Sequence, residues 1–231
     1  DLALTSIKVK DYRGFLLADG TGFGKTRQLL AIADQYRKST GEKVLILTEN
    51  KTTIDQNFTN DAAAMGIDMK QFKTGTYGGF KDSKSGGVKP EFDQDWGMVL
   101  FDEAHNLKNY DSLQATAARR LKKKKVVYAT ATPMDRPSAG AFMWSDVMGQ
   151  DYLTTLDKLG MRIMRETVFV KNKGKVTKEV PVLKEGVSPQ QMIANIQSMR
   201  NAAIRGGRML KRYYPFFGTT NDITVEMSDK D

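Results

Sequence analysis

The sequence predicts an α/β fold in which helices flank a central, mostly parallel sheet. Short apolar runs alternate with helical patterns through about the first 135 residues, which is typical of repeated strand–helix–strand units. The chain has 231 residues, of which 40% are hydrophobic and 27% are charged. These values are those of a globular protein with a substantial core, and they exclude wholesale disorder. We therefore expect one main α/β domain with a smaller α+β accessory region beside it.

Apolar runs and periodic patterns give the order of the elements in the main domain. Buried strands are predicted at residues 14–18, 44–48, 98–101 and 126–129, with a weaker strand at 71–74. Helical periodicity predicts helices at residues 25–38, 52–65 and 112–121. Residues 78–90 combine Gly, Ser, Lys and Pro with little apolar content, which predicts a mobile surface loop.

The pattern changes after Pro137, and we place a soft boundary near residue 150. Residues 1–150 are the expected main domain, and residues 151–231 the expected accessory region packing on it. The elements predicted after Pro137 are a helical stretch at 139–160, a hairpin around 172–174, a helix at 188–205 that Ser188 caps, and strands at 213–218 and 222–227.

Composition excludes several classes of site. The chain has no cysteine and one histidine, His105, so disulfides, thiolate sites and multi-histidine metal sites are excluded. No apolar run reaches the roughly 20 residues that span a bilayer. The absence of a signal-peptide pattern and of cysteine favours an intracellular protein: cytoplasmic, nucleoid-associated, or nuclear in a eukaryote. The chain begins at Asp1, and we expect it to be a piece of a longer protein.

Charge favours a polyanionic partner without deciding the matter. The chain carries 36 Lys and Arg against 27 Asp and Glu, a net charge of +9. A basic balance is typical of nucleic-acid binding proteins, but some soluble proteins are basic without such a partner. Arg200, Arg205, Arg208 and Arg212 form a basic stretch whose spacing favours a solvated helix face, and Lys122–Lys125 reads as a solvated helix end.

A phosphate-binding loop is the strongest local signal. Residues 17–26 read LADGTGFGKT, between a predicted strand and a predicted helix. In that context backbone N–H groups surround phosphate oxygens, the Lys reaches the β- and γ-phosphates, and the Thr hydroxyl binds Mg²⁺. The strict pattern has glycine where this chain has Asp19. The candidate nucleotide-binding residues are Gly20, Thr21, Gly22, Phe23, Gly24, Lys25 and Thr26.

An acidic pair follows a later strand, where a phosphate-loop hydrolase needs one. Asp102 comes directly after the apolar run at 98–101, in the position that coordinates Mg²⁺. Glu103 is placed to accept a proton from an attacking water, and His105 to relay the nucleotide state. Lys25, Asp102, Glu103 and His105 are thus the candidate catalytic residues, with Thr26 and Asp102 as the Mg²⁺ ligands.

A third motif follows the strand at 126–129. Thr130, Ala131 and Thr132 lie at its end, where small hydroxyl residues can hydrogen-bond the acidic motif and couple its state to the rest of the domain. Taken alone, this segment is compatible with an ordinary strand end.

Together these motifs resemble those of superfamily 2 helicases and translocases. LADGTGFGKT, FDEAHNLKN and ATATPMDRP occur in the order of motifs I, II and III. Asp19, Trp96 and Lys108-Asn109 look Snf2-like, whereas residues 127–132 and 210–217 look more like the strawberry-notch branch. The motifs cover residues 14–137, and the rest of the chain matches loosely.

The resemblance implies a RecA-like N-terminal lobe that binds ATP with Mg²⁺ and contacts nucleic acid, with duplex DNA the expected track. Residues 47–51 match the position of motif Ia, and residues 74–77 that of the next backbone-contacting motif. Lys51, Thr76 and Tyr77 are the candidate nucleic-acid contacts, through loops that position the strand without reading its sequence.

The resemblance also leaves alternatives open. Superfamily 2 motors place ATP between two lobes, and no second lobe with arginine fingers is recognisable after residue 137. The expected activity is that of an ATP hydrolase, weak in the isolated chain because the second lobe of the parent protein is missing. An ATP-dependent protein remodeller and a non-enzymatic DNA-binding module with a vestigial nucleotide site are the alternatives.

Overall fold

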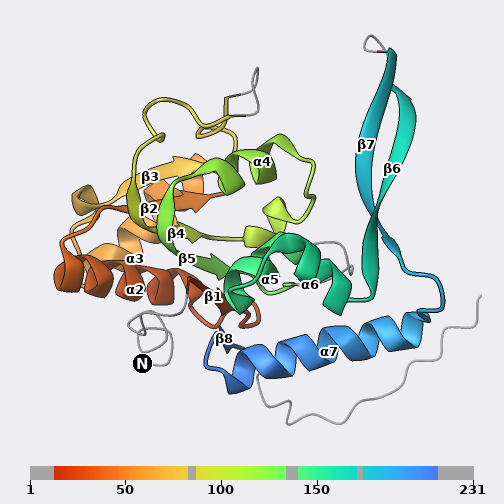
Figure 1. Ribbon diagram of the computed structural model, residues 1–231. Helices are drawn as coiled ribbons and strands as arrows, with labels where there is room; N and C mark the ends of the chain where they lie inside the picture. Colours follow the sequence, from red (N-terminus) through yellow and green to blue (C-terminus); the bar gives the residue numbers. More distant parts are fainter. Residues whose placement is uncertain (1–12, 83–86, 134–139, 171–173, 213–231) are drawn as a thin grey trace, which may run out of the picture.

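The fold is a six-stranded parallel sheet between two layers of helices, with a hairpin that projects from the body (Figure 1). The computed structural model describes residues 13–82, 87–133, 140–170 and 174–212. Within these ranges, no helix is both long enough and apolar enough to cross a membrane. The six-stranded parallel sheet with helices on both sides confirms the predicted α/β class and its mostly parallel sheet.

Four of the six strands lie where apolar runs predict them, and the weaker strand predicted at 71–74 lies at 73–76. In sheet order they are β3 (Lys73–Thr76), β2 (Val44–Thr48), β4 (Trp96–Phe101), β5 (Lys123–Ala129), β1 (Gly14–Leu17) and β8 (Met209–Leu210). All five neighbouring pairs are parallel, so all six strands end at the same edge of the sheet. The short strand β8 was not predicted.

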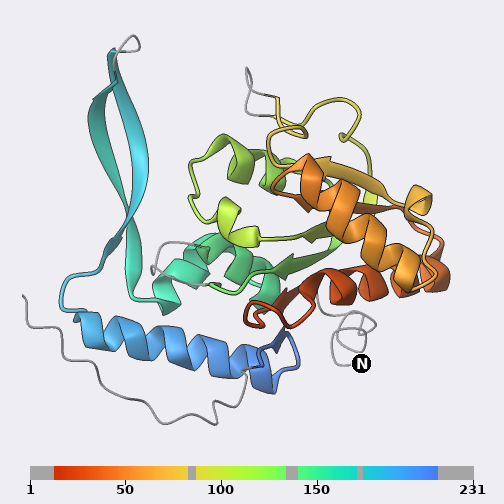
Figure 2. The same ribbon diagram turned by 180° about the vertical axis from the view of Figure 1, so that it is seen from behind.

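Alternate residues of the central strands pack into two separate cores. Phe15, Leu17 and Leu100 face the core formed with α2 (Lys25–Thr40), the π-helix η1 (Thr53–Phe58) and α3 (Thr59–Ala64). Leu16 and Phe101 face the core formed with α4 (Leu113–Arg120), α5 (Ala141–Met148) and α6 (Tyr152–Lys158). This alternation is what a strand buried on both faces produces, and Figure 2 shows the helical layers from behind.

Side-chain caps fix where several helices begin. Ser112, Asp151 and Ser188 each accept a backbone hydrogen bond at the N-terminus of α4, α6 and α7 (Pro189–Arg205). The predicted cap of α7 by Ser188, with Pro189 at its first position, is confirmed. Short 3₁₀ turns form η2 (Met69–Gln71) and η3 (Ala104–Leu107).

The C-terminal part leaves the body as a hairpin and then returns to the sheet. Strands β6 (Met161–Val170) and β7 (Gly174–Leu183) pair antiparallel, and Figures 1 and 2 both show them projecting from the body. Helix α7 leads back to β8, which pairs with β1. The division near residue 150 stays a proposal. The strands predicted at 213–218 and 222–227 lie outside the described residues.

Three local predictions need correction. Within the helix predicted at 52–65, residues Thr53–Phe58 adopt the π conformation. In the loop predicted at 78–90, Phe80 is fully buried and Lys81 bridges to Val88, so the described parts of this segment are anchored to the core. Lys123–Lys125 belong to β5 and not to a helix end, and Lys123 Nζ donates to the Ala118 carbonyl.

Candidate nucleotide site

The predicted phosphate loop connects β1 to α2 in the structure. Gly22 and Gly24 adopt positive φ angles of 84° and 68°, a conformation that glycine reaches without steric cost. Gly24 is the residue immediately before α2. The loop therefore ends at a helix N-terminus, where backbone N–H groups and the helix dipole favour an anion.

Lys25 lies beneath this loop. Its side chain is largely buried, and Nζ donates to the backbone carbonyls of Asp19 at 3.3 Å and Gly20 at 3.1 Å. These bonds place an ammonium group against the loop, where a phosphate group can replace the carbonyl partners. Thr26 is half-buried in the first turn of α2, while Thr21, Gly22 and Gly24 are exposed.

Asp19 has partners that the sequence did not predict. Its carboxylate is fully buried and accepts bonds from the backbone N–H of Arg212 at 2.7 Å, from Arg212 Nε at 3.0 Å and from Gln28 Nε2 at 3.2 Å. Arg208 Nη1 donates to the Met148 carbonyl at 2.7 Å. Arg208 and Arg212 both lie beyond α7, so the predicted solvated helix face is wrong for these two residues.

Asp102 lies at the end of β4, on the same edge of the sheet. Its N–H donates to the Leu47 carbonyl at 2.8 Å, and the residue is 5% exposed. Burial raises the pKa of the Asp102 carboxyl to about 6, and the charge of Glu103 adds to the rise. The Glu103 N–H and the charge of Lys25 act in the opposite direction, which shows that the phosphate-loop lysine and the acidic turn share one electrostatic environment.

Glu103 has an unusual backbone conformation. Its φ is +48°, and among the described residues it is the one non-glycine residue with positive φ. Such a conformation costs free energy and persists where surrounding structure imposes it. Glu103 Oε2 lies 3.2 Å from His105 Nδ1, and both side chains are partly exposed. The turn thus presents Glu103 toward solvent while Asp102 remains buried.

The third motif connects directly to the phosphate loop. Thr130 is fully buried, and its N–H donates to the carbonyl of Leu17, two residues before Asp19. Thr130 Oγ1 accepts the Thr132 N–H at 3.1 Å. Thr132 is exposed and Ala131 half-buried. The structure therefore brings the motif beside the loop, and its coupling role stays a prediction.

The donors at this edge fit the Mg²⁺ ion that the motifs imply. Magnesium prefers carboxylate, hydroxyl and water oxygens and is usually held by one or two carboxylates plus substrate phosphates. The Asp102 carboxylate and the Thr26 hydroxyl supply such oxygens, and a cation would relieve the burial of an ionised Asp102. The described residues contain no group of three or more His, Cys, Asp or Glu that could hold a metal without substrate.

Comparisons with known proteins agree on one family. The model of the SNF2-related domain family matches residues 80–158. A bovine (Bos taurus) SWI/SNF-related matrix-associated actin-dependent regulator of chromatin subfamily A-like protein 1 is 32% identical over 143 residues, which are 53% of this chain and 14% of that protein. Over these residues the chain therefore resembles the N-terminal lobe of Snf2-like superfamily 2 proteins.

Solved structures share the fold of this chain. A Sulfolobus solfataricus SWI2/SNF2 ATPase core in complex with dsDNA matches with a TM-score of 0.59 and 18% identity, over 91% of this chain and 42% of that chain. The S. solfataricus SWI2/SNF2 ATPase core domain matches with a TM-score of 0.57, 18% identity and coverage of 94% and 42%. The chain spans less than half of these relatives.

The predicted nucleic-acid contacts differ in accessibility. Lys51 is exposed after β2, and Thr76 is half-buried, with Oγ1 accepting the Gly79 N–H at 2.9 Å. Tyr77 is 3% exposed. Its hydroxyl donates to the Asp102 carbonyl at 2.6 Å, so the prediction of Tyr77 as a direct nucleic-acid contact is corrected to a role inside the core.

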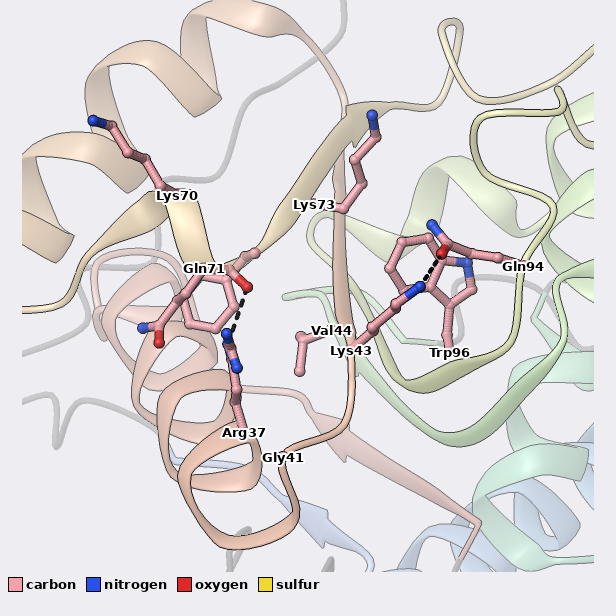
Figure 3. Close-up of a pocket in the computed structure, with 10 residues that line it drawn as sticks. Arg37, Gly41, Lys43, Val44, Lys70, Gln71, Lys73, Gln94 and Trp96 are labelled. Atoms are coloured by element: carbon pink, nitrogen blue, oxygen red, sulfur yellow. Dashed lines mark hydrogen bonds between the residues drawn. The ribbon is translucent and has the colours of Figure 1, made fainter.

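A separate pocket of about 380 Å³ lies at the opposite edge of the sheet (Figure 3). Arg37, Lys43, Lys70 and Lys73 line it, but Figure 3 shows the last two extending away from the first two. Arg37 Nε and Lys43 Nζ donate to the Gln71 carbonyl and Gln94 Oε1. The C-terminus of α2, with its partial negative charge, lies here beside Arg37, and the pocket is separate from the nucleotide site.

Proposed function

We propose that the chain is the ATP-binding lobe of a nucleic-acid-dependent ATPase that moves along DNA as a translocase or helicase. One observation carries this proposal: Lys25, Asp102, Glu103 and Thr130 converge at the edge where β1, β4 and β5 end. Ligands of parallel α/β sheets bind at this edge. The similarity to the SNF2-related domain family and to a SWI/SNF-related protein supports an ATPase lobe of this kind.

The residues have distinct roles in this proposal. The loop from Gly20 to Gly24 surrounds the phosphates, and the Lys25 ammonium exchanges its carbonyl partners for the β- and γ-phosphates. Thr26 and Asp102 hold Mg²⁺, which supplies charge neutralisation at the phosphates when it is bound.

Glu103 accepts a proton from the water that attacks the γ-phosphate in line. His105 holds the Glu103 carboxylate in position through the 3.2 Å contact between Nδ1 and Oε2. The Thr130 N–H donates to the Leu17 carbonyl, and the Thr130 hydroxyl accepts the Thr132 N–H. Through these two bonds the exposed Thr132 couples the phosphate loop to the surface of the lobe.

Duplex DNA is the proposed track, and a second RecA-like lobe is the proposed partner that completes the ATP site. A solved structure with the same fold is described as a complex with dsDNA. The exposed Lys51 and the half-buried Thr76 follow β2 and end β3, at the edge that carries the nucleotide site. We propose an intracellular protein, in keeping with a chromatin-regulator relative.

The test measures ATP hydrolysis by the longest natural protein that carries this chain, with and without duplex DNA. DNA should stimulate hydrolysis. Glu103→Gln should abolish hydrolysis while leaving Mg-ATP binding intact, because the glutamine amide cannot accept the proton of the attacking water. The 231-residue chain alone should bind Mg-ATP and hydrolyse it slowly, since it lacks arginine fingers from a second lobe.

Two outcomes would replace the proposal. Hydrolysis that neither DNA nor RNA stimulates would favour an ATP-dependent protein remodeller. DNA binding without any Mg-ATP binding would favour a non-enzymatic module with a vestigial nucleotide site. Robust turnover by the chain alone, lost in Lys25→Ala, would show that no second lobe is needed.

A further inference from the structure

We propose that Arg212 is a positioning residue for the phosphate loop, holding the loop in its nucleotide-binding conformation through the buried carboxylate of Asp19. The inference rests on the proposed function, because it assigns a role within the same nucleotide site. It adds a residue from the far end of the described chain, 193 positions from its partner.

The contact is too extensive to be an ordinary surface ion pair. Arg212 approaches Asp19 with its backbone N–H, its Nε and its Nη2, the last at 2.5 Å. The Asp19 side chain is fully buried, whereas that of Arg212 is 48% exposed. A carboxylate without access to water depends on such donors, because an unpaired buried charge is costly. The planar guanidinium fits this geometry better than a lysine ammonium does.

The same guanidinium also contacts the other side of the loop. The Arg212 Cζ atom lies 5.5 Å from the centre of the Phe23 ring, within the range of a cation–π interaction. Gln28, from the first turns of α2, donates to both Asp19 Oδ2 and the Phe23 carbonyl. Arg212 and Gln28 thus join positions 19 and 23, which flank the glycines expected to surround the phosphates.

Backbone pairing brings Arg212 to this place. The N–H groups of Leu16 and Ala18 donate to the carbonyls of Arg208 and Leu210, so β8 follows β1 to the beginning of the loop. The strict phosphate-loop pattern has glycine at position 19, and Arg212 explains the acidic residue here. Movement of α7 and β8 would consequently be transmitted to the nucleotide site.

The test combines two readouts on the 231-residue chain. Arg212→Gln should speed amide hydrogen exchange across residues 18–24 in the absence of nucleotide and weaken Mg-ATP binding by roughly tenfold. The effect is moderate because the backbone N–H of residue 212 and Gln28 still donate to Asp19. Arg205→Gln is the matched control: Arg205 is exposed at the end of α7, and its replacement should change neither readout.

A double-mutant cycle separates positioning from general destabilisation. Asp19→Asn should weaken Mg-ATP binding about as much as Arg212→Gln, and the double variant should be no weaker than either single variant. Additive losses, or unchanged exchange and binding in Arg212→Gln, would overturn the inference. If Arg212→Gln does not fold, Arg212→Lys serves, because it keeps the charge and loses the planar fork. Wild-type binding equal to that of Arg212→Lys would then overturn it.

The two readouts also distinguish this inference from the proposed function. Absence of Mg-ATP binding by the wild-type chain would refute the nucleotide site. The exchange experiment on the ligand-free chain would still decide whether Arg212 holds the loop.

Discussion

The Tyr77 hydroxyl donates a 2.6 Å hydrogen bond to the backbone carbonyl of Asp102. Tyr77 follows β3, Asp102 follows β4, and the Tyr77 ring is stacked on Phe101 with centroids 6.4 Å apart. A loop expected to contact nucleic acid is therefore bonded to the backbone of the expected Mg²⁺ ligand. In the proposed ATPase, this bond provides a short physical connection between the DNA side and the ATP side of the lobe.

Tyr77→Phe should destabilise the chain and weaken that connection. The variant leaves a buried carbonyl without this donor, and we expect the free energy of unfolding to fall by about 1 kcal/mol, measured by urea denaturation. Tyr152→Phe is the control, because the buried Tyr152 hydroxyl has no hydrogen-bond partner among the described residues. Its removal should be neutral or stabilising. Equal losses in the two variants would contradict the importance of the Tyr77 bond.

Asp102→Asn should stabilise the metal-free chain at neutral pH. Burial raises the pKa of Asp102 to about 6, so the folded chain retains a proton that the unfolded chain releases near about pH 4. The carboxyl therefore lowers stability as the pH rises from about 4 to about 6, and the loss persists above that range.

The asparagine removes this charge, and we expect a gain of about 1–3 kcal/mol at neutral pH that disappears below about pH 4. Denaturation at a series of pH values measures it. Asp93→Asn, at an exposed ion pair with Lys122, should change stability little at any pH. A destabilised Asp102→Asn chain at neutral pH would show that the hydrogen bonds of the carboxylate outweigh its burial.

Gly14→Ala should disturb the contact between β1 and α5. A Cβ atom at position 14 would lie 2.7 Å from the backbone carbonyl of Asp146 and 2.8 Å from the Val147 nitrogen, so the helix must shift. We expect a loss of about 1–3 kcal/mol in unfolding free energy. Gly78→Ala meets nothing within 4 Å and should be nearly neutral. Thermal denaturation of both variants compares them.

Lys51→Gln should reduce the salt dependence of duplex DNA binding. Each phosphate contact contributes to the slope of log affinity against log salt, and loss of one should lower that slope by about one unit. Lys38→Gln is the matched control. Lys38 lies in the last turn of α2, away from the nucleotide edge, and forms an ion pair with Asp34. Equal slopes for Lys51→Gln and the wild type would remove Lys51 from the DNA interface.

The sequence predicted where the candidate site residues lie better than it predicted the residues that hold them in place. Lys25, Asp102 and Thr130 follow strongly apolar strands, and the parallel sheet brings those strand ends together. The Asp19–Arg212 pair joins distant parts of the chain, and no local pattern signals it. β8 has two residues, too few for a recognisable apolar run. The positive φ of Glu103 is imposed by tertiary structure, and the burial of Tyr77 was hidden by its position in an apparently solvated loop.

The place of β8 in the sheet also has a consequence for protein synthesis. Among the described strands β1 is made first, yet its edge partner β8 is made some 190 residues later. Until then, the Leu16 and Ala18 amides cannot form their bonds to residues 208 and 210. A nascent chain that has completed the other five strands therefore still exposes one edge of its phosphate-loop strand. Nucleotide binding should accordingly begin only after residue 212 has emerged.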